Sequence, residues 1–405
     1  LGPGILSLDS RAAARVAEWE AAGLFPRALA RTGQVPHAAA PSALLAWIRD
    51  HEPERYARIA HVLSCKDWLR FCLTGVIGTD RTEASTAFTD LSGQGWDKGA
   101  LALYGLDALS TALPPVAAPG EIVGCITPEA AARTGLRMGT PVAAGLHDVT
   151  ASALGVGGHR PGAVDIVAGT YSINEIVTDR PLADPRWFCR AGIAVGTWNA
   201  MAISPASTAS YDWTLGILRP AGDDVHAVLG AEIREALARP STLLFHPFLF
   251  GAPTGPDPSG AFLGLHGWHD RGDLLRAVLE GIAYNHRTHV EALAEGFPFA
   301  AARLSGGVSR NPDFAQMMAD VLGLPVTVSR TGEAAAWGAA LCAGTAAGLY
   351  ASPLDDPRDV AALAQGYAPD AARHAAYDRR YDVYSRAVEA LRPLWPDIAA
   401  LGGEP

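Results

Sequence analysis

The stretch that decides the fold is residues 141–176, PVAAGLHDVTASALGVGGHRPGAVDIVAGTYSINEI. A short apolar run at residues 141–144 predicts a strand, and the small residues at 149–154 predict a helix that follows a tight turn. A glycine-rich bend then leads into a second apolar strand at residues 164–168. Strand, helix and strand in this order are typical of an α/β protein.

Groups with useful chemistry follow both predicted strands. Asp148 comes after the first strand, and Gly169 and Thr170 come directly after the second. In α/β folds, ligands gather at the carboxyl ends of strands, where backbone N–H groups point outward. A phosphoryl transferase needs a carboxylate for the acceptor hydroxyl and a turn that holds the donor phosphate. The alternatives are a helix cap for Asp148 and an ordinary turn for the Gly-Thr pair.

Composition narrows the class of protein. The 405 residues are 49% hydrophobic and 18% charged, which suits a large core in two or three domains. A net charge of −10 without a basic cluster argues against nucleic acid as a partner. Five scattered cysteines predict reduced thiols. Neither a membrane-spanning run nor a signal peptide is recognisable, so we expect a cytoplasmic protein without a membrane partner.

A second glycine-rich segment lies at residues 303–328, RLSGGVSRNPDFAQMMADVLGLPVTV. Its glycines, Gly306 and Gly307, permit a backbone contact with a nucleotide that a Cβ atom would block. Asn311 opens a predicted helix, where its amide either meets a purine or caps the helix. The chain has no G-x-x-x-x-G-K-[ST] loop, no G-x-S-x-G elbow and no Rossmann fingerprint.

Together these segments resemble the FGGY carbohydrate kinases, which phosphorylate sugars and polyols with MgATP. In that family an Asp in a G-x-x-D context precedes a Gly-Thr phosphate loop, and residues 303–328 are similar to its adenosine motif. Residues 66–75, KDWLRFCLTG, and 79–87, TDRTEASTA, resemble two further family segments, and residues 245–290 form the longest match. The resemblance covers nearly the whole chain, in the family's order.

The resemblance implies an actin-like, ribonuclease H-like α/β fold of two duplicated domains, with ATP and sugar in a cleft between them. Residues 1–157 would then be the remainder of the N-terminal sugar-binding domain. Residues 158–405 would be the C-terminal nucleotide-binding domain. We draw this division in the glycine-rich bend that follows the helix at residues 149–154.

The resemblance also implies the roles of the site residues. Asp148 would be the general base, would touch the sugar and would be the metal ligand for Mg²⁺. His147 would either contact the sugar or pack beside the turn. The residues that would bind ATP are Gly169, Thr170, Gly306, Gly307 and Asn311.

Two classes of function stay open. Within the family the chain looks most like the L-xylulose (3-keto-L-gulonate) kinase and xylulokinase branch, so we expect a ketopentose such as L-xylulose, or a related keto sugar or polyol. D-xylulose, erythritol and glycerol are alternative substrates.

The other class is a non-catalytic sugar- or nucleotide-binding relative, because the family's first phosphate loop, D-x-G-T, is absent. That loop either precedes Leu1 in a longer chain or has been lost. A homodimer stays open.

The match has departures. Thr208 and Ala209 stand where the family places a glycine beside the ATP phosphates, and Ala252-Pro253 stand where many members have Glu-Arg. We interpret Asp80 as a helix or turn cap.

Overall fold

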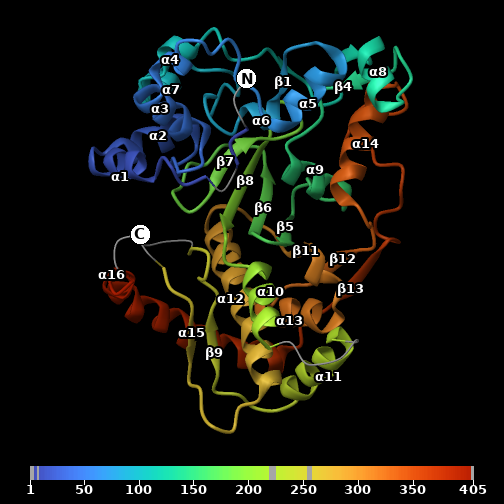
Figure 1. Ribbon diagram of the computed structural model, residues 1–405. Helices are drawn as coiled ribbons and strands as arrows, with labels where there is room; N and C mark the ends of the chain where they lie inside the picture. The colour runs from blue at the N-terminus through green and yellow to red at the C-terminus, as the bar shows by residue number, and fades with distance from the viewer. Residues whose placement is uncertain (1–3, 7–8, 219–224, 253–257, 403–405) are drawn as a thin grey trace. The chain divides into compact units, whose positions relative to one another are not determined.

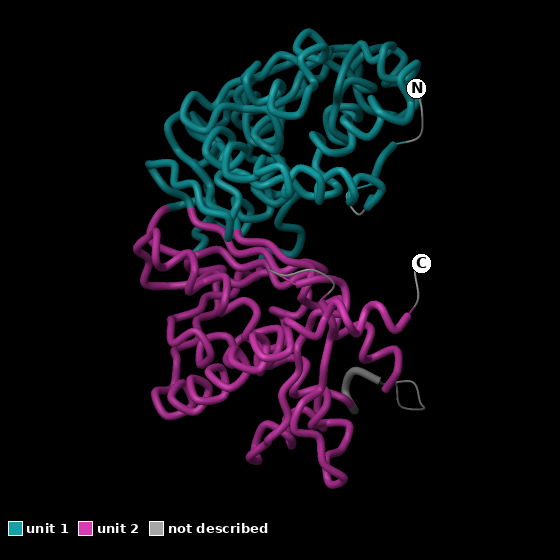
Figure 2. Tube along the Cα trace, turned by 90° about the vertical axis from the view of Figure 1, so that its left-hand side faces the viewer, with its two compact units in different colours: residues 1–160, 177–201, 331–360 teal, residues 161–176, 202–330, 361–405 magenta. Residues whose placement is uncertain are grey.

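The computed structural model describes residues 4–6, 9–218, 225–252 and 258–402. The chain divides into two compact units, coloured teal and magenta in Figure 2. Each unit is assembled from separate parts of the sequence. Unit 1 comprises Leu1–Arg160, Val177–Met201 and Thr331–Val360, and unit 2 comprises Pro161–Ile176, Ala202–Arg330 and Ala361–Pro405. The predicted division after residue 157 stays a prediction.

Unit 1 combines helices with short strand pairs (Figure 1). Its helices are α1 (Ala13–Ala21), α2 (Leu24–Thr32), α3 (Pro41–His51), α4 (Pro53–Tyr56), α5 (Cys65–Thr74), α6 (Arg81–Ala84), α7 (Lys98–Leu103), α8 (Pro128–Thr134), α9 (Asp148–Gly155), α14 (Ala334–Ala346) and the 3₁₀ turn η1 (Asp107–Leu109). Its strands are the parallel pair β1 (Thr79–Asp80) and β2 (Val116–Ala117), the antiparallel pair β3 (Ile122–Cys125) and β4 (Pro141–Ala143), and β7 (Phe188–Ala191).

A seven-stranded sheet has the order β13-β12-β11-β5-β6-β8-β7. Its other members are β5 (Ala163–Ala168), β6 (Ser172–Thr178), β8 (Trp198–Ser204), β11 (Ala301–Ser305), β12 (Val326–Ser329) and β13 (Ala364–Tyr367). Strands β5, β11 and β12 run parallel, with Ser305 opposite Val167. The segments that follow β5 and β11 therefore leave the same edge of the sheet. The boundary between the units falls within β6 and within β8.

Helices and a hairpin complete unit 2. They are α10 (Thr208–Leu218), α11 (Val225–Leu237), α12 (Arg271–Gly296), α13 (Pro312–Leu322), α15 (Ala371–Leu391), α16 (Trp395–Ala400), the 3₁₀ turns η2 (Gly307–Arg310) and η3 (Arg392–Leu394), and the hairpin β9 (Leu244–His246) with β10 (Ala261–Leu263). Helix α12 is buried throughout its middle, residues 275–286, where its apolar residues include Leu275, Val278 and Ile282. An N-terminal capping box at Asp270 and Asp273 starts it.

The deciding stretch folds as predicted. The expected strand, helix and strand are β4, α9 and β5, each within one or two residues of its predicted bounds. The α/β class is therefore confirmed. Within the described residues, no helix combines the length and the apolar character needed to cross a bilayer.

Candidate active site

Asp148 stands at the start of a helix, directly after a tight turn. Gly145 has φ of 84°, and the turn brings the chain from β4 into α9, of which Asp148 is the first residue. Its side chain is 86% exposed, and Oδ1 accepts the N–H of Val149 at 2.7 Å. The N-cap position belongs to His147. The carboxylate is therefore accessible and stands at the positive end of the helix dipole.

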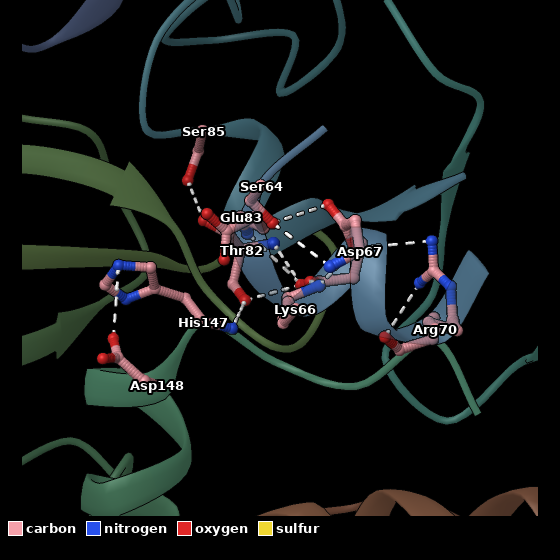
Figure 3. Close-up of polar contacts among 11 residues, drawn as sticks. Ser64, Lys66, Asp67, Arg70, Thr82, Glu83, Ser85, His147 and Asp148 are labelled. Atoms are coloured by element: carbon pink, nitrogen blue, oxygen red, sulfur yellow. Dashed lines mark hydrogen bonds and ion pairs between the residues drawn. The ribbon is translucent and has the colours of Figure 1, made fainter. Parts of the chain in front are cut away.

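His147 lies against this carboxylate (Figure 3). Its Nε2 is 3.5 Å from Asp148 Oδ1. Burial lowers the pKa of His147 to about 4, and the nearby charge of Arg190 acts in the same direction. The imidazole is therefore neutral at pH 7, so the contact with Asp148 is not an ion pair.

Hydrogen bonds from several elements fix the turn before Asp148. Ala144 N donates to Glu121 O at 2.9 Å, and Gly145 N donates to Pro119 O at 3.0 Å. The side chain of Arg70 donates to Ala144 O at 3.0 Å. The N–H of His147 donates to the hydroxyl of Thr82 at 2.8 Å. The last contact fixes the residue next to Asp148.

A charge cluster lies behind Thr82, built from α5 and the start of α6 (Figure 3). Lys66 Nζ is 2.7 Å from Asp67 Oδ1 and 2.6 Å from Asp80 Oδ2. Both aspartates are almost fully buried, at 2% and 0% exposure. Burial alone would lower the pKa of Lys66, but the two carboxylates raise it above its ordinary value. Lys66 therefore stays charged and compensates the buried carboxylates.

Local capping explains why these carboxylates point inward. Asp80 Oδ1 accepts the N–H groups of Thr82 and Glu83, at 2.7 and 3.3 Å, and so caps α6 as predicted. Ser64 caps α5 and donates from its hydroxyl to Asp67 Oδ2 at 2.9 Å. The hydrogen bonds that cap α5 and α6 thus also hold the carboxylates of Asp67 and Asp80 next to Lys66.

Glu83 is a further carboxyl close to this region. Burial raises the pKa of Glu83 to about 7, and although Lys66 opposes this, the charges of Asp80, Asp67 and Asp148 add to it. The Glu83 carboxyl therefore titrates near neutral pH, well above the usual range of a glutamate.

Unit 2 carries the predicted phosphate turn. Gly169 and Thr170 follow β5 directly, and Thr170 is exposed. The N–H of Gly169 donates to Tyr171 O at 3.3 Å, and its carbonyl accepts the N–H of Thr208 at 3.0 Å. Thr208 begins α10. The backbone N–H of Thr208 therefore supports the turn, and this contact does not require a glycine at position 208.

Gly306 lies beside this turn, and the packing of the protein itself explains why this residue is a glycine. It follows β11, has φ of 98°, and a Cβ atom there would lie 2.2 Å from Ala168 O. The close approach of the two strand ends already requires glycine at this position, so its residue type alone is no argument for a nucleotide contact. Gly307, in contrast, faces open space, with no atom within 4 Å of where a Cβ would lie.

Asn311 caps α13. Its Oδ1 accepts the N–H groups of Asp313 at 2.9 Å and Phe314 at 3.4 Å. The capping alternative is thus confirmed, and contact with a purine stays a prediction. Other buried polar residues of unit 2 are core residues: His286 Nδ1 lies 2.8 Å from Asn174 Oδ1, and His289 Nε2 lies 3.0 Å from Ser204 Oγ.

The predicted site residues thus fall into two sets. His147 and Asp148 belong to unit 1, whereas Gly169, Thr170, Gly306, Gly307 and Asn311 belong to unit 2. Of the departures from the family pattern, Ala252 lies in the described part of the chain and Pro253 lies outside it.

A metal ion at this site would need most of its ligands from a bound substrate and from water. Within the described ranges, no group of three or more His, Cys, Asp or Glu side chains could hold one. Mg²⁺ commonly binds through one or two carboxylates together with substrate phosphates and water. The single exposed carboxylate of Asp148 therefore fits a Mg²⁺ that a nucleotide brings, and does not fit an ion held by the protein alone.

Lys66, Arg70 and Thr82 were not predicted as site residues. A signal was present, because Lys66 is one of only two lysines in the chain and lies in a segment already singled out. The contact of Thr82 with His147 and that of Arg70 with Ala144 join positions 65 and 74 apart in sequence, which no local pattern reveals.

Comparison with known proteins gives consistent matches along the chain. The profile of the FGGY family of carbohydrate kinases, N-terminal domain, matches residues 1–155, and that of the C-terminal domain matches residues 166–347. The L-xylulose/3-keto-L-gulonate kinase of Escherichia coli (strain K12) is 33% identical over 97% of this chain and 79% of its own length. The erythritol kinase of Brucella abortus (strain 2308) is 30% identical over 99% of this chain and 80% of its own.

A solved structure agrees with this. The crystal structure of xylulose kinase from Rhodospirillum rubrum superposes with a TM-score of 0.85 at 33% identity, covering 98% of this chain and 81% of that one.

Proposed function

The chain belongs to the FGGY family of carbohydrate kinases, and from this premise we propose that it transfers the γ-phosphoryl group of ATP to a hydroxyl of L-xylulose or a related keto sugar or polyol. Membership makes it an enzyme that phosphorylates a sugar, with ATP as its co-substrate, and its fold is the actin-like two-domain fold expected from the sequence.

Asp148 is the proposed general base. It would accept the proton of the sugar hydroxyl as that oxygen attacks the γ-phosphate. The observation that carries this role is an exposed carboxylate at the first position of α9, on a turn that four hydrogen bonds hold in place. Because His147 is neutral, it leaves the carboxylate charge of Asp148 uncompensated and can hydrogen-bond a sugar hydroxyl.

The proposed nucleotide contacts come from unit 2. The segments after β5 and β11 supply Gly169, Thr170, Gly306 and Gly307, and Asn311 starts α13 just beyond them. The exposure of Thr170, which carries a hydroxyl donor, and the open surroundings of Gly307 support contacts with phosphate and nucleotide. Bound Mg²⁺ would neutralise charge on the phosphates, and Asp148 is the residue that would hold it.

The substrate is proposed from the relatives. L-xylulose is the first choice because a kinase of L-xylulose and 3-keto-L-gulonate is 33% identical over almost the whole chain. D-xylulose, erythritol and glycerol are the competing acceptors.

Sugar-dependent release of ADP tests the proposal. The purified protein should release ADP from MgATP with one of L-xylulose, 3-keto-L-gulonate, D-xylulose, erythritol or glycerol, and the highest kcat/KM should be with L-xylulose or 3-keto-L-gulonate. Asp148→Asn should lower kcat roughly 10²–10⁴-fold, the range of general-base catalysis. The matched control is Glu129→Gln, which alters another exposed acid in the first turn of a helix of unit 1 and should keep the wild-type rate.

The two parts of the proposal fail separately. Absence of ADP release with every acceptor would contradict the kinase assignment for this polypeptide. Wild-type turnover by Asp148→Asn would contradict only the assignment of the base.

A further inference from the structure

We infer that Thr82 is a positioning residue for the proposed base: its hydroxyl links the turn before Asp148 to the buried charge cluster of Lys66, Asp67 and Asp80. The inference rests on the proposed function of Asp148 and concerns a residue outside its chemistry. Thr82 is 2% exposed and so is a poor candidate for contact with substrate.

The hydroxyl of Thr82 uses both of its hydrogen-bonding capacities. The N–H of His147 can only donate, so Oγ1 accepts there, at 2.8 Å. The hydroxyl proton is then free for Asp80 Oδ1, which lies 2.6 Å away. A short hydroxyl–carboxylate bond of this kind is stronger than a neutral one. The direction of both bonds is therefore fixed, and each strengthens the other.

Ion pairs hold the cluster behind Thr82 together. Lys66 bridges Asp80 to Asp67, and Arg70 lies 3.4 Å from Asp67 Oδ1. Arg70 also donates to Ala144 O at 3.0 Å, so the cluster reaches the turn by a second route. The turn that carries Asp148 is thus held at its beginning by Arg70 and at its end by Thr82 (Figure 3).

Such an anchor matters because a general base works only when it is in place. Asp148 itself is 86% exposed, and the only contacts of its carboxylate within the described residues are with Val149 and His147. Its position is therefore set by the backbone on which it stands. A displacement of about 1 Å in such a group can cost on the order of 100-fold in rate.

Thr82→Val tests the inference, because valine keeps the branched shape and removes the hydroxyl. Asp80 still accepts the backbone N–H groups of residues 82 and 83, so α6 keeps its cap. We expect kcat to fall roughly 10–100-fold, the consequence of a displaced base, while KM for ATP and for the sugar stays unchanged. Thr82→Ser, which restores the hydroxyl, should recover most of the lost kcat.

The matched control is Ser85→Ala. The hydroxyl of Ser85 is also buried and donates to Thr82 O at 2.8 Å, but it does not reach the turn. This variant removes one buried hydrogen bond of the same short helix and should keep the wild-type kcat. An equal loss of kcat in Ser85→Ala and Thr82→Val would overturn the inference, because it would reduce both effects to loosening of α6.

Amide hydrogen exchange gives a readout that needs no turnover. The His147 amide, followed in a peptide covering residues 145–149, should exchange faster in Thr82→Val than in wild type, Thr82→Ser or Ser85→Ala. Unchanged exchange overturns the anchor whether or not the protein is active. Faster exchange with wild-type kcat overturns the positioning role. A wild-type protein that is inactive towards every acceptor contradicts the proposed kinase, and exchange alone then decides whether Thr82 holds the turn.

Discussion

Lys66 is the residue on which the buried carboxylates of unit 1 depend. It is one of the chain's two lysines, and its ammonium group lies within 2.7 Å of both Asp67 and Asp80. Two aspartates with 2% and 0% exposure would repel one another and lose solvation without it. Replacing a whole buried ion cluster by apolar side chains is often neutral, but removing a single partner leaves the opposite charges buried and uncompensated.

Lys66→Met should consequently destabilise the protein. Removal of one partner from a buried ion pair commonly costs about 3–5 kcal/mol, and the lower end applies here because the Lys66 side chain is 25% exposed. Urea unfolding at pH 7.5 measures the loss. Lys98→Met, which changes the exposed lysine at the start of α7, should stay within about 0.5 kcal/mol of wild type. Equal stability of the two variants would contradict this role of Lys66.

At the scale of elements, α9, the helix that begins with Asp148, is positioned by its packing against α14. The two helices lie side by side within unit 1 (Figure 1). A Cβ atom on Gly338 would lie 2.1 Å from Ala151 O, and one on Gly155 would lie 1.8 Å from Ala334 O. The small-residue spacing that the sequence shows in α14 thus serves close packing against the backbone of α9.

Gly338→Ala should therefore destabilise the protein although alanine is the better helix former. Helix propensity alone would favour alanine by about 1 kcal/mol, but overpacking against a backbone that cannot yield typically costs about 1–3 kcal/mol. We expect a lower thermal midpoint. Gly216→Ala in α10, where no atom lies within 4 Å of the added Cβ, should raise the midpoint instead. A Gly338→Ala protein as stable as wild type would show that the helices separate without cost.

At the scale of the whole molecule, buried histidines predict sensitivity to acid. Among the residues whose burial the structure describes, four histidines are buried: His159, His246, His286 and His289. Burial lowers the pKa of His286 to about 3 and that of the other three to about 4. Below pH 6.5 these histidines are protonated in the unfolded chain but stay neutral in the folded chain. The stability that they contribute is therefore complete above pH 6.5 and is lost as the pH falls towards 4.

Urea unfolding should therefore show a clear fall in stability between pH 7 and pH 5, with each neutral histidine contributing up to about 1.4 kcal/mol per pH unit. Glu83 opposes the trend, since its raised pKa lets the folded state bind a proton first, but it is one group against these four histidines and against His37 and His147, whose pKa values burial also lowers to about 4. Between pH 7 and pH 8.5 the pH lies above both the folded and the ordinary pKa of these four histidines, so stability should change much less than between pH 7 and pH 5. Equal stability at pH 5 and pH 7 would contradict the neutral, buried state of these side chains.

Much of this protein was determined by its sequence alone, because the relevant signals are local. Hydrophobic period and capping residues predicted β4, α9 and β5, the cap at Asp80 was predicted for the same reason, and a cap was one of the two alternatives for Asn311. These features depend on residues a few positions apart. The segment motifs were likewise enough to reach the family and the α/β class.

Only the tertiary structure decided what holds Asp148 in place and why Gly306 must be glycine. Thr82 meets His147 across 65 positions of sequence, and Gly306 meets Ala168 because β5 and β11 are neighbours in the sheet. Hydrogen bonds and close backbone contacts of this kind exist only after distant segments have packed together. The position of a side chain, its charge and the size that its site allows therefore depend on the folded structure and cannot be read from any single stretch of the sequence.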